Sequence, residues 1–156
     1  MEFATLLADL GREMKIDLTD AVASCSCTLA FGTSNPQLPL EVSLEASDQD
    51  GVSQGLLHLH AVIGEAPVLD AETLFGRLLQ MHVLGFATMQ GMFGYDPLLR
   101  RILFFRSLSL PALTEEDVLE AIERFVDQAE RWRDHLPAFA ASANRDAVSS
   151  GFLPMA

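Results

Sequence analysis

Apolar residues first recur along this chain with the period of a helix. Phe3, Leu6, Leu7 and Leu10 lie at i, i+3, i+4 and i+7, which is the spacing of one face of an amphipathic helix. Gly11 follows directly and weakens the end of this predicted helix. The stretch 15–24 is polar and mixed, and its pattern predicts neither a helix nor a strand.

The period then changes to strict alternation. Cys27–Phe31, Leu40–Glu45 and Leu57–Ile63 each alternate apolar with small or polar residues, which is typical of half-buried strands. Between the second and third strands, residues 47–53 are acidic and polar, and they predict a loop with Asp50-Gly51 at its tip. Short connections of this kind indicate an antiparallel meander.

A second helix is predicted from Asp70, a favourable N-cap residue, to Met89. From Met81 onward its apolar residues point in nearly every direction, so one sheet cannot cover them all. Core packing is the usual explanation for such a stripe. We nevertheless interpret the apolar stretch up to Phe93 as a self-association surface or a peptide groove, because the helix is apolar on more than one side. Methionine adapts well to the varied shapes of such partners.

Two further strands are predicted over Gly91–Tyr95 and Leu99–Leu108. The last helix has the clearest start, because Thr114 and Asp117 have the spacing of a capping box. Its apolar face continues to Pro137, where we expect the helix to end. The order is therefore α-β-β-β-α-β-β-α, an α+β fold with helices packed on an antiparallel sheet. We expect a single domain over residues 1–136 and a flexible tail over residues 137–156.

The net charge of the chain excludes some classes of binding partner. The chain has 22 acidic and 10 basic residues, a net charge of −12, and Lys15 is its one lysine. Nucleic acid and anionic membrane repel such a chain, so neither is an expected partner. The negative charge suits a partner that carries positive charge, and it equally suits the simpler role of keeping an apolar surface soluble. The sequence also lacks a signal peptide and a membrane-spanning apolar run. With Cys25 and Cys27 expected as reduced thiols, these features favour a cytosolic protein.

Two short pairs of residues are the sharpest candidates for chemistry. Cys25-x-Cys27 and His58-x-His60 each place two ligands on one strand face. They could form a Cys₂His₂ metal site or a Cys–His nucleophilic pair. The spacing differs from the usual metal knuckle, and two packing thiols with two exposed histidines are the favoured interpretation. No G-x-S-x-G elbow or phosphate-binding loop occurs. We therefore expect no enzyme activity, no cofactor and no metal.

Several strings, taken in order, resemble the class I type III secretion chaperones, the CesT-like family. They are Phe3-x-x-Leu6-Leu7-x-x-Leu10-Gly11, Cys27-x-Leu29, Leu78-Leu79, Gly91-x-x-Gly94-Tyr95-Asp96 and Phe125-Val126-x-x-Ala129-x-x-Trp132. The similarity covers residues 2–136. His82 and Pro97 depart from the family pattern, at the paired leucines and at the turn before the next strand.

The resemblance implies a homodimer in the bacterial cytoplasm and a secreted effector whose N-terminal segment wraps around the chaperone in extended form, which keeps the effector soluble and competent for secretion. The implied dimer interface comprises Met81, Val83, Leu84, Phe86, Met89, Met92 and Phe93. The implied effector-binding surface draws on Phe3, Leu6, Leu7, Leu29, Leu40 and Val42, some of which must be core. Contacts with the secretion machinery are a further partner class. A chain of this fold that sequesters a regulatory protein is the alternative, and a small metal-dependent enzyme using the Cys and His pairs is a second one.

Overall fold

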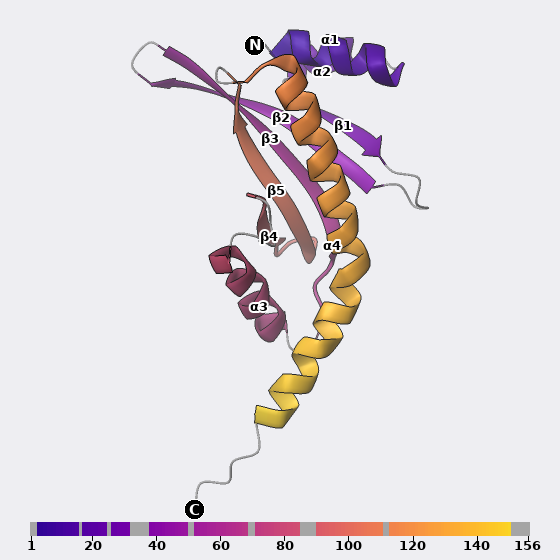
Figure 1. Cartoon of the computed structure of the whole chain (residues 1–156), viewed down its shortest axis with the longest axis vertical. Helices are drawn as coiled ribbons and strands as arrows, with labels where there is room; N and C mark the ends of the chain where they lie inside the picture. The colour runs from indigo at the N-terminus through magenta and orange to yellow at the C-terminus, as the bar shows by residue number, and fades with distance from the viewer. Residues whose placement is uncertain are drawn as a thin grey trace, which may run out of the picture.

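The computed structural model describes residues 3–15, 17–24, 26–31, 38–49, 52–68, 71–84, 90–110 and 113–150. Within these residues the chain forms four helices and five strands (Figure 1). In chain order they are α1 (Phe3–Met14), α2 (Thr19–Ser24), β1 (Ser26–Phe31), β2 (Leu38–Gln49), β3 (Val52–Glu65), α3 (Ala71–Leu84), β4 (Met92–Asp96), β5 (Arg101–Ser109) and α4 (Glu115–Ser150). The predicted α+β fold is confirmed.

The short helix α2 was not predicted from the sequence. It begins just after Asp17, whose Oδ1 accepts hydrogen bonds from the backbone N–H and the hydroxyl of Thr19, at 3.0 and 2.6 Å. These bonds lower the pKa of the Asp17 carboxyl. A helix of six residues is too short to show a hydrophobic period, so only this local capping chemistry marks it.

All five strands belong to one antiparallel sheet with the order β1-β2-β3-β5-β4. The β2–β3 ladder continues to the pair Gln49↔Val52, so residues 47–49 and 52–53 are paired strand and not the predicted loop. Asp50-Gly51 itself lies outside the described residues. Polar residues can extend a two-stranded ribbon beyond the core, where backbone pairing needs no apolar alternation.

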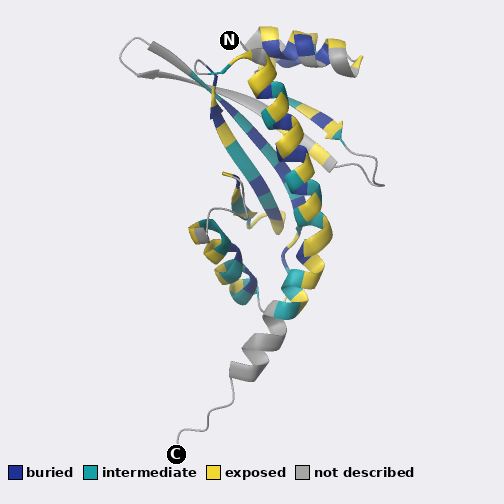
Figure 2. Cartoon of the chain, in the orientation of Figure 1, coloured by how far each residue is buried: buried dark blue, intermediate teal, exposed yellow. Residues whose placement is uncertain are grey.

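The core lies on one face of the sheet, under the helices. All four helices contribute to one buried cluster, through Leu6 of α1, Ala21 of α2, Leu74 of α3 and Val118 of α4. The inward strand residues in this cluster are Leu29, Leu57, Leu59, Ala61, Ile63, Ile102, Phe104 and Leu108. The alternation of buried and less buried residues along β3 and β5 is visible in Figure 2. None of the described helices packs on the opposite face of the sheet, which we call the open face.

The helix α4 runs along the sheet in Figure 1. The sequence predicted where this helix starts but not where it ends. The predicted capping box is confirmed: the Thr114 N–H and hydroxyl both donate to Asp117 Oδ2, at 2.9 and 2.6 Å, and the Asp117 N–H donates to Thr114 Oγ1. The predicted end is wrong, because the helix passes through Pro137 and continues to Ser150.

Contacts with α3 explain why α4 continues beyond its proline. Arg77 of α3 donates from Nη1 to Ser142 Oγ at 3.0 Å, and its guanidinium lies 6.0 Å from the ring centre of Phe139. These contacts lie one turn beyond Pro137 and offset the hydrogen bond that the proline removes. The tail predicted for residues 137–156 is thus helical to Ser150, whereas a domain boundary at residue 136 stays a prediction. None of the described helices is long and apolar enough to cross a membrane.

Candidate functional site

The first candidate surface is the free edge of the sheet at β1. This strand is terminal in the sheet order and pairs with β2 alone among the described strands. Its second edge therefore presents backbone N–H and C=O groups to a further strand. Leu29 is buried against the core, Cys27 and Phe31 are half-buried, and Thr28 and Ala30 are exposed. An added strand would place alternate side chains beside these two rows.

The residues predicted for effector binding fall into two groups. Leu6 and Leu7 are 0% exposed and Leu29 is 3% exposed, so all three are core residues in this chain. Phe3 belongs to α1, and Leu40 and Val42 to β2, but their side chains lie outside the described part. An amphipathic stripe predicts that one face of a helix or strand is buried. It does not tell whether that face is buried by the same chain or by a partner.

A second candidate surface lies on α3 and β4. Three large apolar residues there are exposed: Leu79 and Val83 on α3, at 60% and 87%, and Tyr95 on β4, at 41%. We call these residues the α3–β4 face. Met92 of β4 is also 44% exposed, but it pairs with Phe105 and lies on the opposite side of the strand from Tyr95, which pairs with buried Ile102. Large exposed apolar residues grouped on adjacent elements indicate a contact with another protein.

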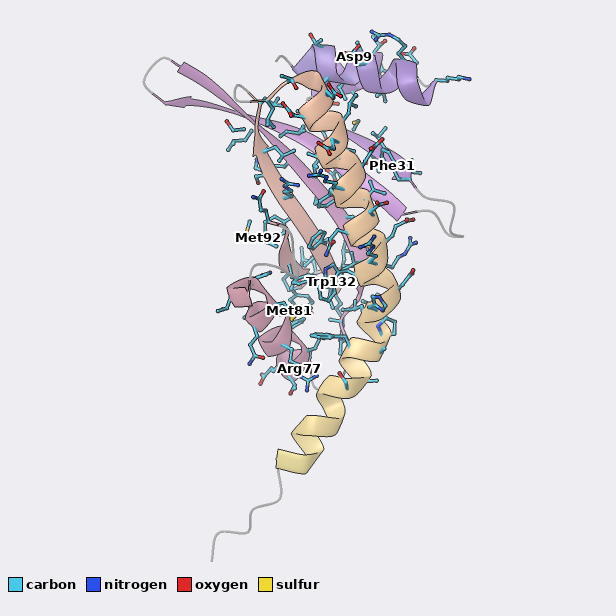
Figure 3. All side chains as sticks on the ribbon, in the orientation of Figure 1. Asp9, Phe31, Arg77, Met81, Met92 and Trp132 are labelled. Atoms are coloured by element: carbon cyan, nitrogen blue, oxygen red, sulfur yellow. The ribbon has the colours of Figure 1, made fainter. Side chains whose placement is uncertain are left out.

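The predicted dimer-interface residues lie in different places. Val83 is on this face, Met92 is exposed on the other side of β4, and Met81 is half-buried. Phe93 instead packs within the chain, with its ring centre 4.8 Å from that of Trp132 and 5.4 Å from that of Phe104. Figure 3 shows Met81, Met92 and Trp132 where α3, β4 and α4 come together. The side chain of Leu84, and Phe86 and Met89 altogether, lie outside the described residues.

The candidate Cys and His ligands are separated by the sheet itself. Cys27 pairs with Val42, which pairs with Leu59, so Cys27 is on the core face. His58 and His60 pair with Ser43 and Glu41 and are on the open face. The four-ligand metal site and a catalytic pair built on Cys27 are therefore wrong. Cys25 lies outside the described residues, and no group of three or more metal-binding side chains occurs in the described part of the chain.

Burial raises the pKa of the Cys27 thiol, and the negative charge of Glu41 raises it further. A thiol in this state is mostly protonated near neutral pH, so it is a poor nucleophile. His58 Nδ1 lies 2.8 Å from Ser107 Oγ, and His60 Nε2 lies 3.3 Å from Glu41 Oε2. The histidines therefore have partners on the open face that do not involve a thiol.

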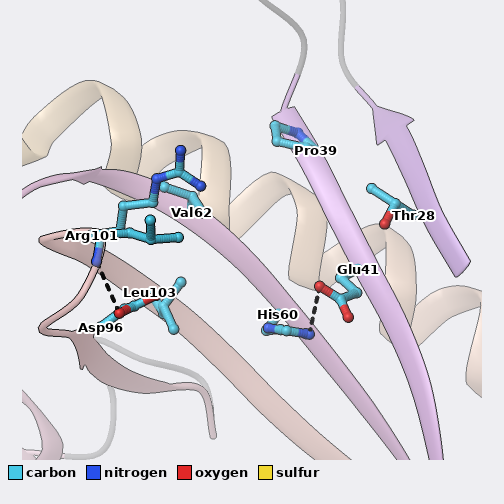
Figure 4. A pocket seen from close by; sticks show the side chains of 9 residues that line it. Thr28, Pro39, Glu41, His60, Val62, Asp96, Arg101 and Leu103 are labelled. Atoms are coloured by element: carbon cyan, nitrogen blue, oxygen red, sulfur yellow. Dashed lines mark hydrogen bonds and ion pairs between the residues drawn. The ribbon is translucent and has the colours of Figure 1, made fainter. Parts of the chain in front are cut away.

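A hollow of about 300 Å³ lies on the open face (Figure 4). Its lining comes from all five strands and from the turn between β4 and β5: Thr28, Pro39, Glu41, His60, Val62, Asp96, Leu99, Arg101 and Leu103. Val62 and Leu103 are half-buried and face each other in the β3–β5 ladder. Charged and polar groups surround this apolar floor. We call this site the open-face hollow.

The profile of the Tir chaperone protein (CesT) family matches residues 5–133 of the chain. The chain belongs to this family. The assignment confirms the predicted resemblance and the predicted chaperone class of function. No curated protein shows significant sequence similarity to the chain.

Solved structures of similar fold accompany the family match. One is the crystal structure of the ExsC–ExsE complex, at 20% identity and a TM-score of 0.64, covering 86% of this chain and 96% of that one. Another is the structure of the HopA1–SchA chaperone–effector complex, at 14% identity and a TM-score of 0.59, covering 85% of this chain and 93% of that one. At these identities the similarity establishes the fold of this family member.

The exposed residues Leu79 and Tyr95 and the open-face hollow were not predicted as sites from the sequence. The alternation over Leu57–Ile63 does place His58, His60 and Val62 on the face opposite Leu57. The sequence pattern therefore indicates which β3 residues are on the open face. It does not reveal that β1, β2 and β5 bring Thr28, Glu41 and Leu103 to the same place. That juxtaposition depends on strand order, which alternation does not determine.

Proposed function

We propose that the chain is a type III secretion chaperone that acts as a homodimer and binds the N-terminal segment of a secreted effector in extended form. The observation that carries the proposal is the free edge of β1 in a member of the Tir chaperone protein (CesT) family. An extended segment gains backbone hydrogen bonds at such an edge, and its alternate side chains select the sequence. Binding of this kind keeps the segment from folding or aggregating and needs no catalytic residue.

The sides of the β1 edge differ in character. On the core side, half-buried Cys27 and Phe31 flank buried Leu29 and offer apolar contact. On the open side, Thr28 and Ala30 are exposed. We therefore expect a bound segment that alternates apolar residues with polar or basic ones. Basic residues also suit a chaperone whose net charge is −12.

The homodimer rests on the α3–β4 face. Val83 is 87% exposed and Leu79 is 60% exposed, and burying such side chains against a second copy releases apolar surface from water. A two-fold dimer is the commonest assembly for a small chain with one such face. Met81, Leu84, Phe86, Met89 and Met92 remain proposed members of this interface, whereas Phe93 packs within the chain behind it.

The test of effector binding starts from the native organism. The tagged chain is isolated from those cells, and the co-purifying proteins are identified by mass spectrometry. One specific secreted protein supports the proposal, whereas a non-secreted regulatory protein favours the sequestering role. Hydrogen–deuterium exchange of the purified complex then locates the contact. We expect the amides of β1 to gain protection, and protection that leaves β1 unchanged contradicts strand addition.

The test of the dimer uses a matched pair of exposed valines. The unmodified chain should have twice the 17.0 kDa mass of one copy in gel filtration with light scattering. Val83→Asp places a charge on the α3–β4 face and should give single copies. Val68→Asp is the control, because Val68 is also 82% exposed but belongs to the segment after β3. An unmodified chain that runs as a single copy overturns the dimer.

A further inference from the structure

The open-face hollow is a shallow site with an apolar floor and a charged rim. Val62 and Leu103 form the floor, and Leu99, which is 58% exposed, forms part of the wall. A volume of about 300 Å³ lies at the lower end of ordinary ligand pockets. The hollow lies on the face of the sheet and is partly open to solvent, so it suits side chains of a polypeptide lying across the sheet better than an enclosed small molecule.

The rim is charged unevenly. At the β2–β3 side, the Glu41 side chain is 47% exposed and forms one ion pair among the described residues, with His60 at 3.3 Å. At the β4–β5 side, Asp96 and Arg101 are opposite each other in the strand ladder, so that side carries one acid and one base. A cation is therefore attracted more strongly to the Glu41 side than to the β4–β5 side, where Arg101 offsets Asp96.

The hollow is continuous with the β1 edge. Thr28, the β1 member of its lining, pairs with Glu41, the acidic residue of its rim. A strand added at β1 lies about 4.8 Å beyond it, and every second side chain of that strand is on the same side as Thr28. A segment that leaves the β1 edge toward the open face thus meets the hollow first.

We propose that the open-face hollow binds one basic and one aliphatic side chain of the same extended segment that pairs with β1. The basic side chain pairs with Glu41, and the aliphatic side chain packs between Val62, Leu103 and Leu99. This inference rests on the proposed function and specifies which partner sequence the chaperone selects.

The geometry also sets the spacing of the two residues. Glu41 on β2 and Leu103 on β5 are separated by β3, which is about 10 Å across the sheet. An extended chain advances about 3.3 Å per residue, and residues two apart are on the same side. A lysine or arginine side chain spans the remaining distance. The expected motif is therefore a basic residue two positions from a leucine, isoleucine or valine.

The test uses peptides, so it does not depend on knowing the effector. A positional-scanning library of capped extended peptides, each of about twelve residues, is selected on the full chain. The chain should enrich a basic residue two positions from an aliphatic one. Equal selection of acidic and basic residues, or no selection at all, overturns the proposal.

Two neighbouring leucines supply a matched control. Leu99 lines the hollow, whereas Leu98, in the same turn and 91% exposed, does not. Both are exposed, so neither substitution disturbs the core. Leu99→Asp should weaken binding of the selected peptide about tenfold, and Leu98→Asp should leave it unchanged. Equal effects of the two variants overturn the assignment of the hollow.

The charge is tested separately with Glu41→Gln. This variant should lower affinity for the basic peptide about fivefold, while a peptide with norleucine in place of the basic residue binds both proteins alike. Should Leu99→Asp instead change the mass of the dimer, the hollow is a contact between copies and the proposal is wrong. A failed co-purification contradicts the proposed function, whereas retained effector binding by Leu99→Asp and Glu41→Gln contradicts only the hollow.

Discussion

His82 of α3 accepts a hydrogen bond at Nε2 from the backbone N–H of Phe93 on β4, at 2.7 Å. The two rings also stack, with centres 5.4 Å apart and planes 15° from parallel. One side chain thus fixes the helix and the strand that form the α3–β4 face. Its partner Phe93 packs in turn against Trp132 of α4, so this contact connects the proposed dimer surface to the core.

Replacing His82 should loosen this attachment. His82→Ala leaves the part-buried Phe93 N–H without its acceptor, which costs about 1–3 kcal/mol of unfolding free energy. Urea unfolding followed by the fluorescence of Trp132 measures the loss. His82→Gln is the control, because an amide oxygen can replace Nε2, and it should retain most of the stability. Equal losses in both variants would show that ring packing, and not the hydrogen bond, is what matters.

Two glycines should respond in opposite ways to alanine. At Gly91 an added Cβ would lie 2.1 Å from Phe104 Cζ, whereas at Gly76 nothing lies within 4 Å. Phe104 is buried in the core and cannot move freely, so Gly91→Ala should destabilise the chain by about 1–3 kcal/mol. Gly76→Ala, in the helix α3, should stabilise it by up to about 1 kcal/mol.

Thermal and urea unfolding of the two variants measure these changes. Both substitutions add the same methyl group, so the difference between them isolates the contact with Phe104. A neutral Gly91→Ala would mean that Phe104 has room to move, and the close approach of residue 91 to the core would then be unimportant for stability.

The sequence predicted the parts of this fold that a single element determines. Alternation over Leu57–Ile63 identified a strand, and the Thr114–Asp117 spacing identified a cap, because backbone geometry alone imposes both patterns. Both are confirmed by the buried row along β3 and by the reciprocal hydrogen bonds of the cap.

The parts that failed depend on contacts between elements. The continuation of α4 past Pro137 rests on Arg77 of α3, which local propensity cannot include. The burial of Leu6 and Leu7 likewise depends on what covers α1. A stripe of leucines predicts a buried face, yet the stripe is the same whether a partner or the same chain buries it. Site residues were therefore harder to predict than elements.

The cap of α4 should make stability fall in acid. Hydrogen bonds from the Thr114 hydroxyl and backbone N–H lower the pKa of the Asp117 carboxyl from its ordinary value of 3.8. The folded state therefore binds this proton less tightly than the unfolded state. The stabilisation is present above the unfolded pKa and is lost as pH falls through the lower, folded pKa. Asp117→Asn should flatten this part of a stability–pH curve, and an unchanged slope would contradict the role of Asp117.

The thiol of Cys27 should react slowly. Its pKa is raised by burial and then by Glu41, so the reactive thiolate is scarce near neutral pH. In a Cys25→Ser chain, iodoacetamide should modify Cys27 at least about tenfold more slowly in the folded state than in urea at pH 8. The rate should rise further with pH above 9. A Glu41→Gln variant should react faster, and fast modification of the folded chain would contradict the burial of this thiol.

The proline within α4 offers the last test, since it asks whether the helix continues in solution. A proline inside a helix costs about 3 kcal/mol relative to alanine, and Pro137 is exposed. Pro137→Ala should therefore raise the unfolding free energy by up to about 3 kcal/mol. Ala138→Gly, at the next exposed position, should lower the unfolding free energy by about 1 kcal/mol, because glycine is less favourable than alanine inside a helix.

Arg77→Ala should reduce the gain from Pro137→Ala, because the contacts of Arg77 with Phe139 and Ser142 hold the segment beyond the proline against α3. If Pro137→Ala and Ala138→Gly are both silent in thermal unfolding, the helix ends before residue 137 in solution, and the end predicted from the sequence is restored.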